Sequence, residues 1–485
     1  MDPRRGLRIA TPFALAILIA ASPAPASLAP HAWLYFAIFL GVVAALILEP
    51  LPPSATGLIG IALVAIFGRW VLFSPADLAA PGFNAPARAV DWALSGFANP
   101  TIWLSFAAFL FATGYQKTGL GRRIALMLVR AMGGRTIALG YAIMLSDLLL
   151  APFTPSNTAR SAGTIYPIIR NIPPLYNSLP FDPSARRIGS YVMWVALAAT
   201  SINSALFLTA LAPNVLATAM IRDATGVEIT WLRWFTGFAP AGILLLAALP
   251  PLAMLLCRPS IRAGRQAPRW ARAELAKLGP VTRAEYTLAA LVLIAVLLWV
   301  FAGGIVHPTT VALTVIVLML IGRVLTWEDI VGNRDAWQAL MLLATLVVLA
   351  DGLSRTGFVR WLAEGAAAPL EGWPPLLSAA VLIVIYFFSH YLFASITAHV
   401  TAMMPITLSV AAAMPGLPLD RFAMLLAYTH GLMGILTPYA TTSGPVYLGS
   451  GYISSAEYWR LGVLFGLIFL AALLLVVAPL EFARA

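Results

Sequence analysis

The chain has 485 residues, of which 61% are hydrophobic and 10% are charged, and its mean hydropathy is +0.89. A soluble domain carries roughly 25% charged residues, so this composition excludes a soluble protein and indicates a polytopic membrane protein. The net charge of +11 does not indicate a nucleic-acid partner, because lysine and arginine gather in the cytoplasmic loops of membrane proteins.

Apolar runs long enough for a bilayer core of about 30 Å recur along the whole chain. None alternates apolar and polar residues as an outer-membrane strand does, so we expect an all-α bundle of about 11 transmembrane helices in an inner (cell) membrane. The runs lie near residues 32–48, 55–72, 98–114, 188–210, 237–256, 285–302, 308–322, 336–353, 420–436 and 459–479.

Residues 1–26 have a basic start and an apolar stretch, a pattern shared by a cleaved signal peptide and a retained first helix. We expect a retained helix. Cys257 is the only cysteine, so we expect no disulfide framework and no cysteine metal site.

Residues 137–171 form an apolar segment that is flanked by basic residues at both ends. Positive charge marks cytoplasmic ends, so we expect this segment to enter the membrane and turn back as a helical hairpin. Its midpoint reads TPSNTARSAG, residues 154–163, where Pro155 can break one helix and Ser156 can cap the next. Irregular backbone at this depth is tolerated only where protein buries it or it lines a wet cavity, so the tip should face a binding site.

A basic cytoplasmic linker, residues 258–284, separates two halves with the same pattern. TGYQKTG at 113–119 matches DGLSRTG at 351–357, and the serine of each hairpin tip follows after 37 residues in the first half and 38 in the second. These serines are Ser156 and Ser395. The sequence therefore predicts an internal repeat.

The second hairpin is expected over residues 376–408, and the number of intervening spans makes it enter from the opposite side of the membrane. A further match, LAPN at 211–214 and LTPY at 436–439, places a proline inside an apolar helix after each hairpin, so broken helices are expected over 188–222 and 420–450. Inverted repeats with broken helices near the bilayer midplane are typical of secondary transporters.

Hairpin tips and broken helices direct unpaired N–H groups at one point, which favours an anion. Two tips provide two such clusters, one for each end of a short dianion, so we expect a dicarboxylate. The residues expected to bind it are Ser156, Asn157, Thr158, Ser395, Thr397, Asn214, Thr437 and Pro438.

Arg160 and His399 occupy equivalent places in the two repeats. Arginine stays charged and can offset substrate charge permanently, whereas histidine does so only when protonated, which predicts a pH dependence. In the alternative interpretation both side chains cap hairpin carbonyls and touch no ligand. His390 and His430 lack repeat partners and are expected to be structural.

Over nearly its whole length the sequence resembles the divalent anion/sodium symporter family, and most of all its citrate/succinate, tartrate/succinate and 2-oxoglutarate/malate exchanger branch. The resemblance implies a homodimer in which each protomer combines a fixed scaffold domain with a mobile transport domain that moves like an elevator. It is carried by HAWLYFAIFLGVVAALILEPLP (31–52), SGFANPTIWLSFAAFLFATGYQKTGLGRRIA (95–125) and GILTPYATTSGPVYLGSGYI (434–453).

The chain departs from the sodium-coupled members of this family at two places. The family has Ser-Asn-Thr at both tips, but Ile396 stands where the second asparagine is expected, and ALAPN at 210–214 lacks the glycine and threonine of the sodium-binding turn. The resemblance therefore implies no sodium site. It also implies that Arg160 and His399 replace the cations, which favours obligatory exchange.

With this resemblance the chain divides into five regions. They are N-terminal scaffold helices (1–97), a first repeat core (98–257) with its hairpin (137–171) and broken helix (188–222), the basic linker (258–284), second-half scaffold helices (285–335), and a second repeat core (336–485) with its hairpin (376–408) and broken helix (420–450).

The sequence thus predicts a transporter that exchanges succinate, malate, 2-oxoglutarate, tartrate or citrate without sodium, metal or cofactor. A sodium-coupled dicarboxylate symporter is the main alternative, followed by an intramembrane enzyme and a channel. The enzyme is disfavoured because Asp147 and Asp351 are single acids in the spans, and no zinc-peptidase or nucleophile-elbow motif is present.

Overall fold

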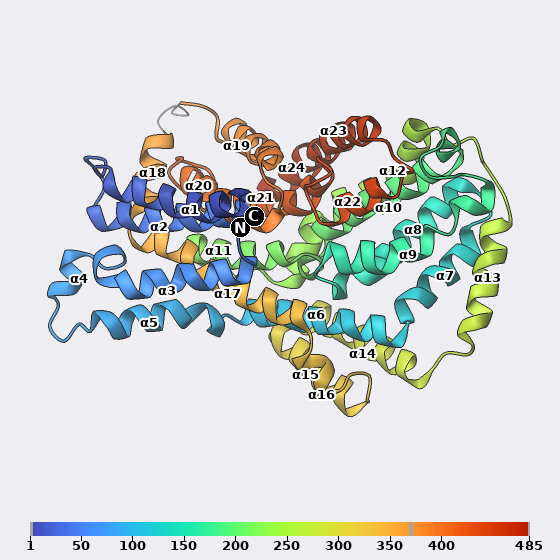
Figure 1. The fold of residues 1–485 in the computed structure, drawn as a ribbon, viewed down its shortest axis with the longest axis horizontal. Coiled ribbons are helices and arrows are strands. Elements are labelled where there is room, and N and C mark those ends of the chain that lie inside the picture. The colour runs from blue at the N-terminus through green and yellow to red at the C-terminus, as the bar shows by residue number, and fades with distance from the viewer. Residues whose placement is uncertain (1–2, 368–371, 484–485) are drawn as a thin grey trace.

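The computed structural model describes residues 3–367 and 372–483, and within these ranges the chain is helical without a β-strand. Figure 1 shows many of the helices running along the long axis of the molecule, with both termini near its middle. The prediction of an all-α polytopic fold is confirmed.

The first half contains helices α1 to α12. Their bounds are α1 (Pro3–Ala21), α2 (Pro30–Leu48), α3 (Pro53–Val71), α4 (Pro75–Ala79), α5 (Ala85–Ser95), α6 (Pro100–Thr118), α7 (Leu120–Met132), α8 (Thr136–Leu150), α9 (Tyr166–Ile169), α10 (Gly189–Leu206), α11 (Ala212–Thr225) and α12 (Trp231–Cys257). Short 3-10 or π segments include η1 (Gly96–Ala98), η2 (Ala151–Phe153), η3 (Thr158–Ile165), η4 (Pro173–Tyr176), η5 (Pro183–Arg187) and η6 (Leu208–Ala210).

The second half contains helices α13 to α24. Their bounds are α13 (Gln266–Leu278), α14 (Arg283–Phe301), α15 (Pro308–Ile321), α16 (Trp327–Val331), α17 (Arg334–Arg355), α18 (Phe358–Ala367), α19 (Pro375–Ser389), α20 (Ile396–Ala412), α21 (Leu419–Leu432), α22 (Ser443–Gly449), α23 (Ser455–Ala472) and α24 (Ala478–Ala483). Short segments are η8 (His390–Leu392), η9 (Met433–Ile435) and η10 (Leu473–Val477).

Among the described residues, eight helices are long and apolar enough to cross a bilayer, or up to nine if the bent pair Ala85–Ala98 and Pro100–Thr118 forms one span. This number is smaller than the expected one. The difference has a physical cause, because α11 and α21 have only 14 residues each, and α11 begins at a break in the chain whereas α21 ends at one. An unbroken span needs about 20 residues.

The internal repeat is visible in how its helices begin and end. Asn99 caps the start of α6, and Asn333 caps the start of α17, each with its side-chain oxygen. Gly119 and Gly357, which follow the two helices, have φ of 77° and 85°, a left-handed conformation that glycine adopts without steric cost. The matched TGYQKTG and DGLSRTG motifs are therefore matched helix ends.

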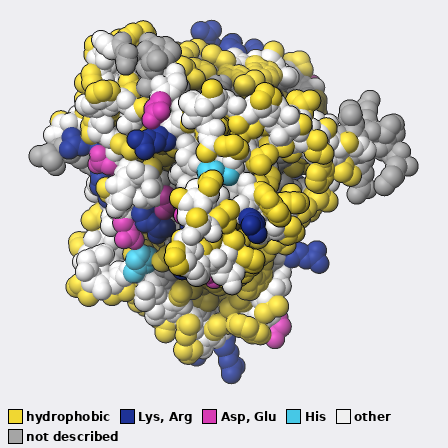
Figure 2. Space-filling view, turned by 90° about the vertical axis from the view of Figure 1, so that its left-hand side faces the viewer, with side chains coloured by type: hydrophobic (Ala, Val, Ile, Leu, Met, Phe, Trp, Pro, Cys, Tyr) yellow, Lys and Arg dark blue, Asp and Glu magenta, His cyan; other side chains and the backbone are white. Residues whose placement is uncertain are grey.

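The two hairpins lie in opposite halves of the molecule. In Figure 1, α8 and α9 lie in the right half beside α7 and α13, whereas α18, α19 and α20 lie in the left half. Figure 2 views the left-hand end, where many basic, acidic and histidine side chains gather on the left of the view and further basic side chains stand at its edges. The basic linker, by contrast, lies at the right-hand end of Figure 1.

The linker includes helix α13, which packs against α7. Arg122 Nη2 lies 2.8 Å from Glu274 Oε2, and Arg123 Nε lies 2.7 Å from Glu285 Oε1. Arg123 also donates to the carbonyl of Gly279 at 2.9 Å. The linker thus contacts the first repeat through Glu274 and the Gly279 carbonyl, and Glu285 of α14, just beyond the linker, adds a further ion pair.

Candidate functional site

The first hairpin turns between η2 and η3. Pro155 has no N–H, which stops the helix, and the Ser156 side chain accepts a hydrogen bond from the N–H of Ala159 at 3.2 Å. The Pro155 carbonyl accepts from the N–H of Ala212 at 3.0 Å, so the tip is joined directly to the start of α11. The tip therefore faces the start of α11.

The second hairpin has the same cap. Ser395 Oγ accepts from the N–H of Ala398 at 3.4 Å, and the backbone bonds that follow, Arg160 N–H to Ser156 O and His399 N–H to Ser395 O, are both 3.0 Å long. The first-turn N–H groups after each serine have no acceptor within their helix. The first-turn N–H groups that the serine side chain does not bind therefore remain available as donors at each tip.

The chain of each repeat is irregular close to its proline motif, but the details differ. The first break covers residues 207–211, and Pro213 lies just beyond it in the first turn of α11, where a missing N–H costs nothing. In the second repeat, η9 ends at Ile435 and α22 begins at Ser443, so Pro438 lies inside the irregular segment.

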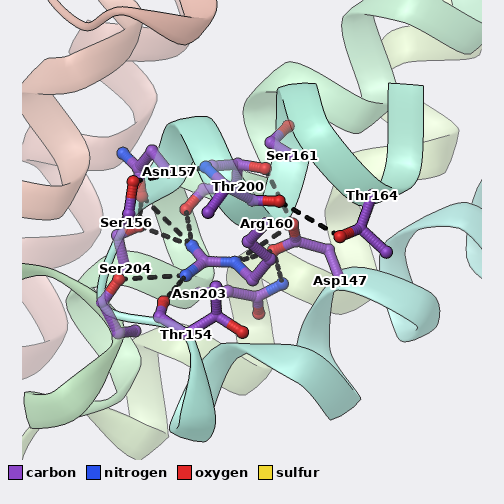
Figure 3. Close-up of polar contacts among 12 residues, drawn as sticks. Asp147, Thr154, Ser156, Asn157, Arg160, Ser161, Thr164, Thr200, Asn203 and Ser204 are labelled. Carbon is purple, nitrogen blue, oxygen red and sulfur yellow. Dashed lines mark hydrogen bonds and ion pairs between the residues drawn. The ribbon is translucent and has the colours of Figure 1, made fainter. Parts of the chain in front are cut away.

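Arg160 is fully buried at the centre of the first repeat (Figure 3). Its Nε lies 3.2 Å from each carboxylate oxygen of Asp147, and its Nη1 donates to the carbonyls of Thr154 and Ala210 at 2.8 and 2.9 Å. Its Nη2 donates to Ser204 Oγ at 2.8 Å and to the Asn157 side-chain oxygen at 3.2 Å. All three nitrogens of the guanidinium are therefore directed at acceptors of the chain.

The Arg160 charge does not stand free to meet a substrate in this structure, because Asp147 lies against it. Asp147 also accepts from Thr200 Oγ1 and Asn203 Nδ2, both at 2.9 Å. The sequence shows Asp147 only as a single acid. An acid inside a membrane helix requires a partner. Arg160 lies on the opposite arm of the same predicted hairpin, so the sequence offers it as a candidate partner for Asp147.

Asn157 and Asn214 lie behind the tip and the break instead of in open space. Asn157 is 6% exposed, and its side-chain oxygen also accepts from Ser204 Oγ at 2.6 Å. Asn214 is fully buried and donates to the carbonyls of Ser204 and Phe207 at 2.7 and 3.2 Å, which lie at the end of α10 and just beyond it. Asn214 thus donates to carbonyls at the end of α10, where carbonyl groups lack partners within the helix.

His399 is also fully buried, but it has no charged partner. Its Nε2 lies 2.8 Å from Ser389 Oγ, and its ring packs 4.4 Å from the ring of Tyr386 and 4.9 Å from that of Phe393. Within the described residues, no carboxylate forms an ion pair with this histidine. The equivalent places in the two repeats therefore hold an ion pair in one and an aromatic contact in the other.

The tips meet the second broken segment from two directions. Thr158 of the first tip forms a hydrogen bond with Thr442, and Ser161 Oγ lies 2.8 Å from Tyr447 Oη. On the other side, a Cβ added at Gly434 would lie 2.9 Å from Thr441 Cγ2 and 3.5 Å from Ile396 Cδ1. Thr441 and Thr442 thus lie between the two hairpins.

Among the remaining expected residues, exposure separates two groups. Thr158 is exposed, whereas Ser156, Ser395, Thr397 and Pro438 are partly exposed. Thr437 is fully buried, and its Oγ1 has no partner among the described residues. The first five can therefore meet a ligand directly.

A cavity leads to the first tip from the side of α6 and α16. It has a volume of about 450 Å³, and Gln116, Ala159, Asn333 and Arg334 line it together with acidic residues of α16 and its flanks. Lys117 and Asp329 form an ion pair nearby. Ala159 follows Thr158 directly, so the cavity ends beside the exposed part of the tip.

Apolar helices, two hairpins capped at their tips, and broken helices between them define a membrane transporter and not an enzyme. The chain belongs to the sodium:sulfate symporter family, whose transmembrane region matches residues 5–480.

Known proteins similar to this chain support the same class. The L-tartrate/succinate antiporters of Escherichia coli (strain K12) and Shigella sonnei (strain Ss046) are each 49% identical to it over 468 residues, which are 96% of this chain and 96% of each relative. The crystal structure of the Alcanivorax borkumensis YdaH transporter aligns with a TM-score of 0.57 at 16% identity and covers 89% of this chain and 99% of that one. At that identity the likeness concerns the fold alone.

Proposed function

We propose that this protein exchanges dicarboxylates such as succinate and tartrate across a bacterial inner membrane, without sodium. The observation that carries the proposal is the pair of serine-capped tips, Ser156 and Ser395, on either side of Thr441 and Thr442. Unpaired N–H groups on two sides suit the two ends of a short dianion. The relatives described as L-tartrate/succinate antiporters indicate the same class of substrate.

In this proposal, the substrate meets Ser156, Thr158, Ser395, Thr397 and Pro438, which are at least partly exposed. Hydroxyl groups and first-turn N–H groups can all donate to carboxylate oxygens. The residues Asn157, Asn214 and Thr437 support the site from behind.

In this proposal, transport is independent of sodium because Arg160 already binds backbone carbonyls of the first repeat that a cation would need. A sodium ion prefers oxygen ligands, as other hard cations do, and the irregular backbone of the first repeat offers the carbonyls of Thr154 and Ala210. Both carbonyls accept hydrogen bonds from Arg160. We infer that the Arg160 guanidinium takes the place of a cation, with Asp147 balancing its charge.

Exchange is favoured over net transport by the cost of moving an empty site. The tips hold donors that the substrate satisfies, and burying a donor without a partner costs about 1–3 kcal/mol. A site that crosses the membrane loaded avoids this cost in both directions.

The proposal includes an elevator-type movement and a homodimer. The mobile part would consist of the hairpins with α10, α11, α21 and α22, and the fixed part of the helices α2, α3, α5, α6, α14, α15 and α17. Cross-linking between engineered cysteines on α6 and the first hairpin, in the presence and absence of succinate, tests the movement, and light scattering of the purified protein tests the dimer.

The main test is uptake of labelled succinate by purified protein in liposomes preloaded with L-tartrate. We expect uptake that unlabelled succinate and tartrate compete away and that sulfate does not. If sulfate competes as well as succinate does, the proposed substrate class is wrong. A sodium-coupled symporter, the alternative that Ile396 and Arg160 disfavour, would instead fill empty vesicles when sodium is supplied outside.

A further inference from the structure

The second hairpin contains a fully buried histidine that the proposed site does not use. His390 begins η8, and its Nε2 lies 3.2 Å from the carbonyl oxygen of Ala440. A carbonyl can only accept, so Nε2 carries the hydrogen and donates it. The Nδ1 of His390 has no partner among the described residues, which is consistent with a neutral ring.

Ala440 belongs to the irregular segment of the second repeat, where backbone carbonyls lose their helical partners. The same situation occurs in the first repeat, where Arg160 donates to the carbonyl of Ala210 in η6. The two alanines are not at matched places relative to their prolines, since Ala210 precedes Pro213 and Ala440 follows Pro438. In both repeats, nevertheless, a side-chain N–H of the hairpin donates a hydrogen bond to a backbone carbonyl of the broken helix.

The groups around His390 form a neutral network. Its ring lies 5.2 Å from the ring of His399. Ser389 Oγ donates its only hydrogen to the carbonyl of Tyr386 at 2.8 Å, so it accepts from His399 Nε2. Tyr386 Oη in turn lies 2.9 Å from His430 Nε2. Among the described residues, no carboxylate takes part in this network, so a charged ring would have no counter-ion there.

The carbonyl that His390 holds precedes the two residues between the hairpins. Thr441 lies against Gly434 together with Ile396, and Thr442 is hydrogen-bonded to Thr158. A shift of Ala440 would therefore disturb the hydrogen bond between Thr442 and Thr158 and the packing of Thr441 beside Gly434.

We propose that His390 is a positioning residue for substrate binding: as a neutral donor it holds the Ala440 carbonyl and thereby sets the place of Thr441 and Thr442 between the two tips. This inference rests on the proposed function. It assigns to a histidine without a repeat partner the task that Arg160 has in the first repeat.

The test compares three substitutions of His390 that differ in whether the side chain can donate a hydrogen bond from the position of Nε2. His390→Gln places an amide N–H near the position of Nε2, His390→Asn carries the same amide on a side chain one methylene shorter, and His390→Phe keeps a ring without a donor. We expect the glutamine variant to keep the KM for succinate exchange within about threefold, and the other two to raise KM at least tenfold with a smaller change in maximal rate. If glutamine is no better than asparagine, the inference is wrong.

A second measurement does not depend on transport. Hydrogen–deuterium exchange of peptides covering residues 433–447 should rise in the asparagine and phenylalanine variants and stay near that of the unchanged protein in the glutamine variant. Equal protection in all three would overturn the inference. If the unchanged protein exchanges no dicarboxylate, the proposed function fails, and the deuterium result still decides whether His390 positions this segment.

Discussion

Asp147 and Arg160 form a fully buried ion pair between the two arms of one hairpin, with Nε 3.2 Å from both carboxylate oxygens. The same guanidinium reaches the tip at Thr154 and the broken helix at Ala210. One side chain thus joins three elements that must keep a common geometry if they are to bind the same ligand.

Removing either partner of this pair should disrupt the first repeat. In Asp147→Asn or Arg160→Ala a buried charge or a set of buried acceptors loses its partner, which costs about 3–5 kcal/mol. We expect both variants to lower the thermal unfolding midpoint in detergent and to lose succinate exchange. Thr164→Ala, on the same hairpin but outside the pair, is the control; a loss of the same size in that variant would show that the effect is not specific.

The two serine caps should contribute about equally to stability and to substrate affinity. Ser156→Ala and Ser395→Ala each remove one N-cap, which costs about 1 kcal/mol, and each removes a hydroxyl that faces the proposed site. We expect each variant to raise KM for succinate. Ser156→Thr and Ser395→Thr keep the hydroxyl and should recover most of the affinity, and an equal defect in the threonine variants would argue against a capping role.

The role of Ile396, which stands where the family has its second asparagine, can be tested directly by substitution. Ile396 is 5% exposed and lies against Gly434, so Ile396→Asn buries an amide at a cost of about 1–3 kcal/mol if it finds no partner. We expect lower stability and no sodium stimulation, because Arg160 still binds the carbonyls of the first repeat. Uptake that becomes sodium-dependent in this single variant would mean that the second tip alone decides coupling.

The exchange rate should not reflect a charge on His399. The ring donates to Ser389, its Nδ1 has no partner among the described residues, and a proton there would introduce a charge without a counter-ion. Between about pH 6 and pH 8, where an ordinary histidine titrates, the protein and its His399→Gln variant should show profiles of the same shape. A titration step that disappears in the variant would restore the charged role expected from the sequence.

The sequence predicts much of this architecture because the strongest signals are local. Apolar runs, helix-breaking Pro155, the capping serines and the matched motifs that end at Gly119 and Gly357 all act within a few residues. Their spacing alone was sufficient to reveal the repeat.

The side-chain partners of Asp147 and His390 could not be predicted from the sequence in the same way. Asp147 lies 13 residues before Arg160, and although the predicted hairpin places them on opposite arms, the sequence does not show that the two side chains form an ion pair. The contact of His390 with Ala440 spans 50 residues, and the broken segment that brings them together has no regular period. Both contacts depend on tertiary packing around irregular backbone.

Sodium-independent exchange is tested by succinate uptake into liposomes that are either preloaded with succinate or empty, each with and without a sodium gradient. We predict uptake only into the preloaded vesicles and at the same rate with and without sodium. Sodium-driven uptake into empty vesicles would contradict both the exchange and the replacement of a cation by Arg160.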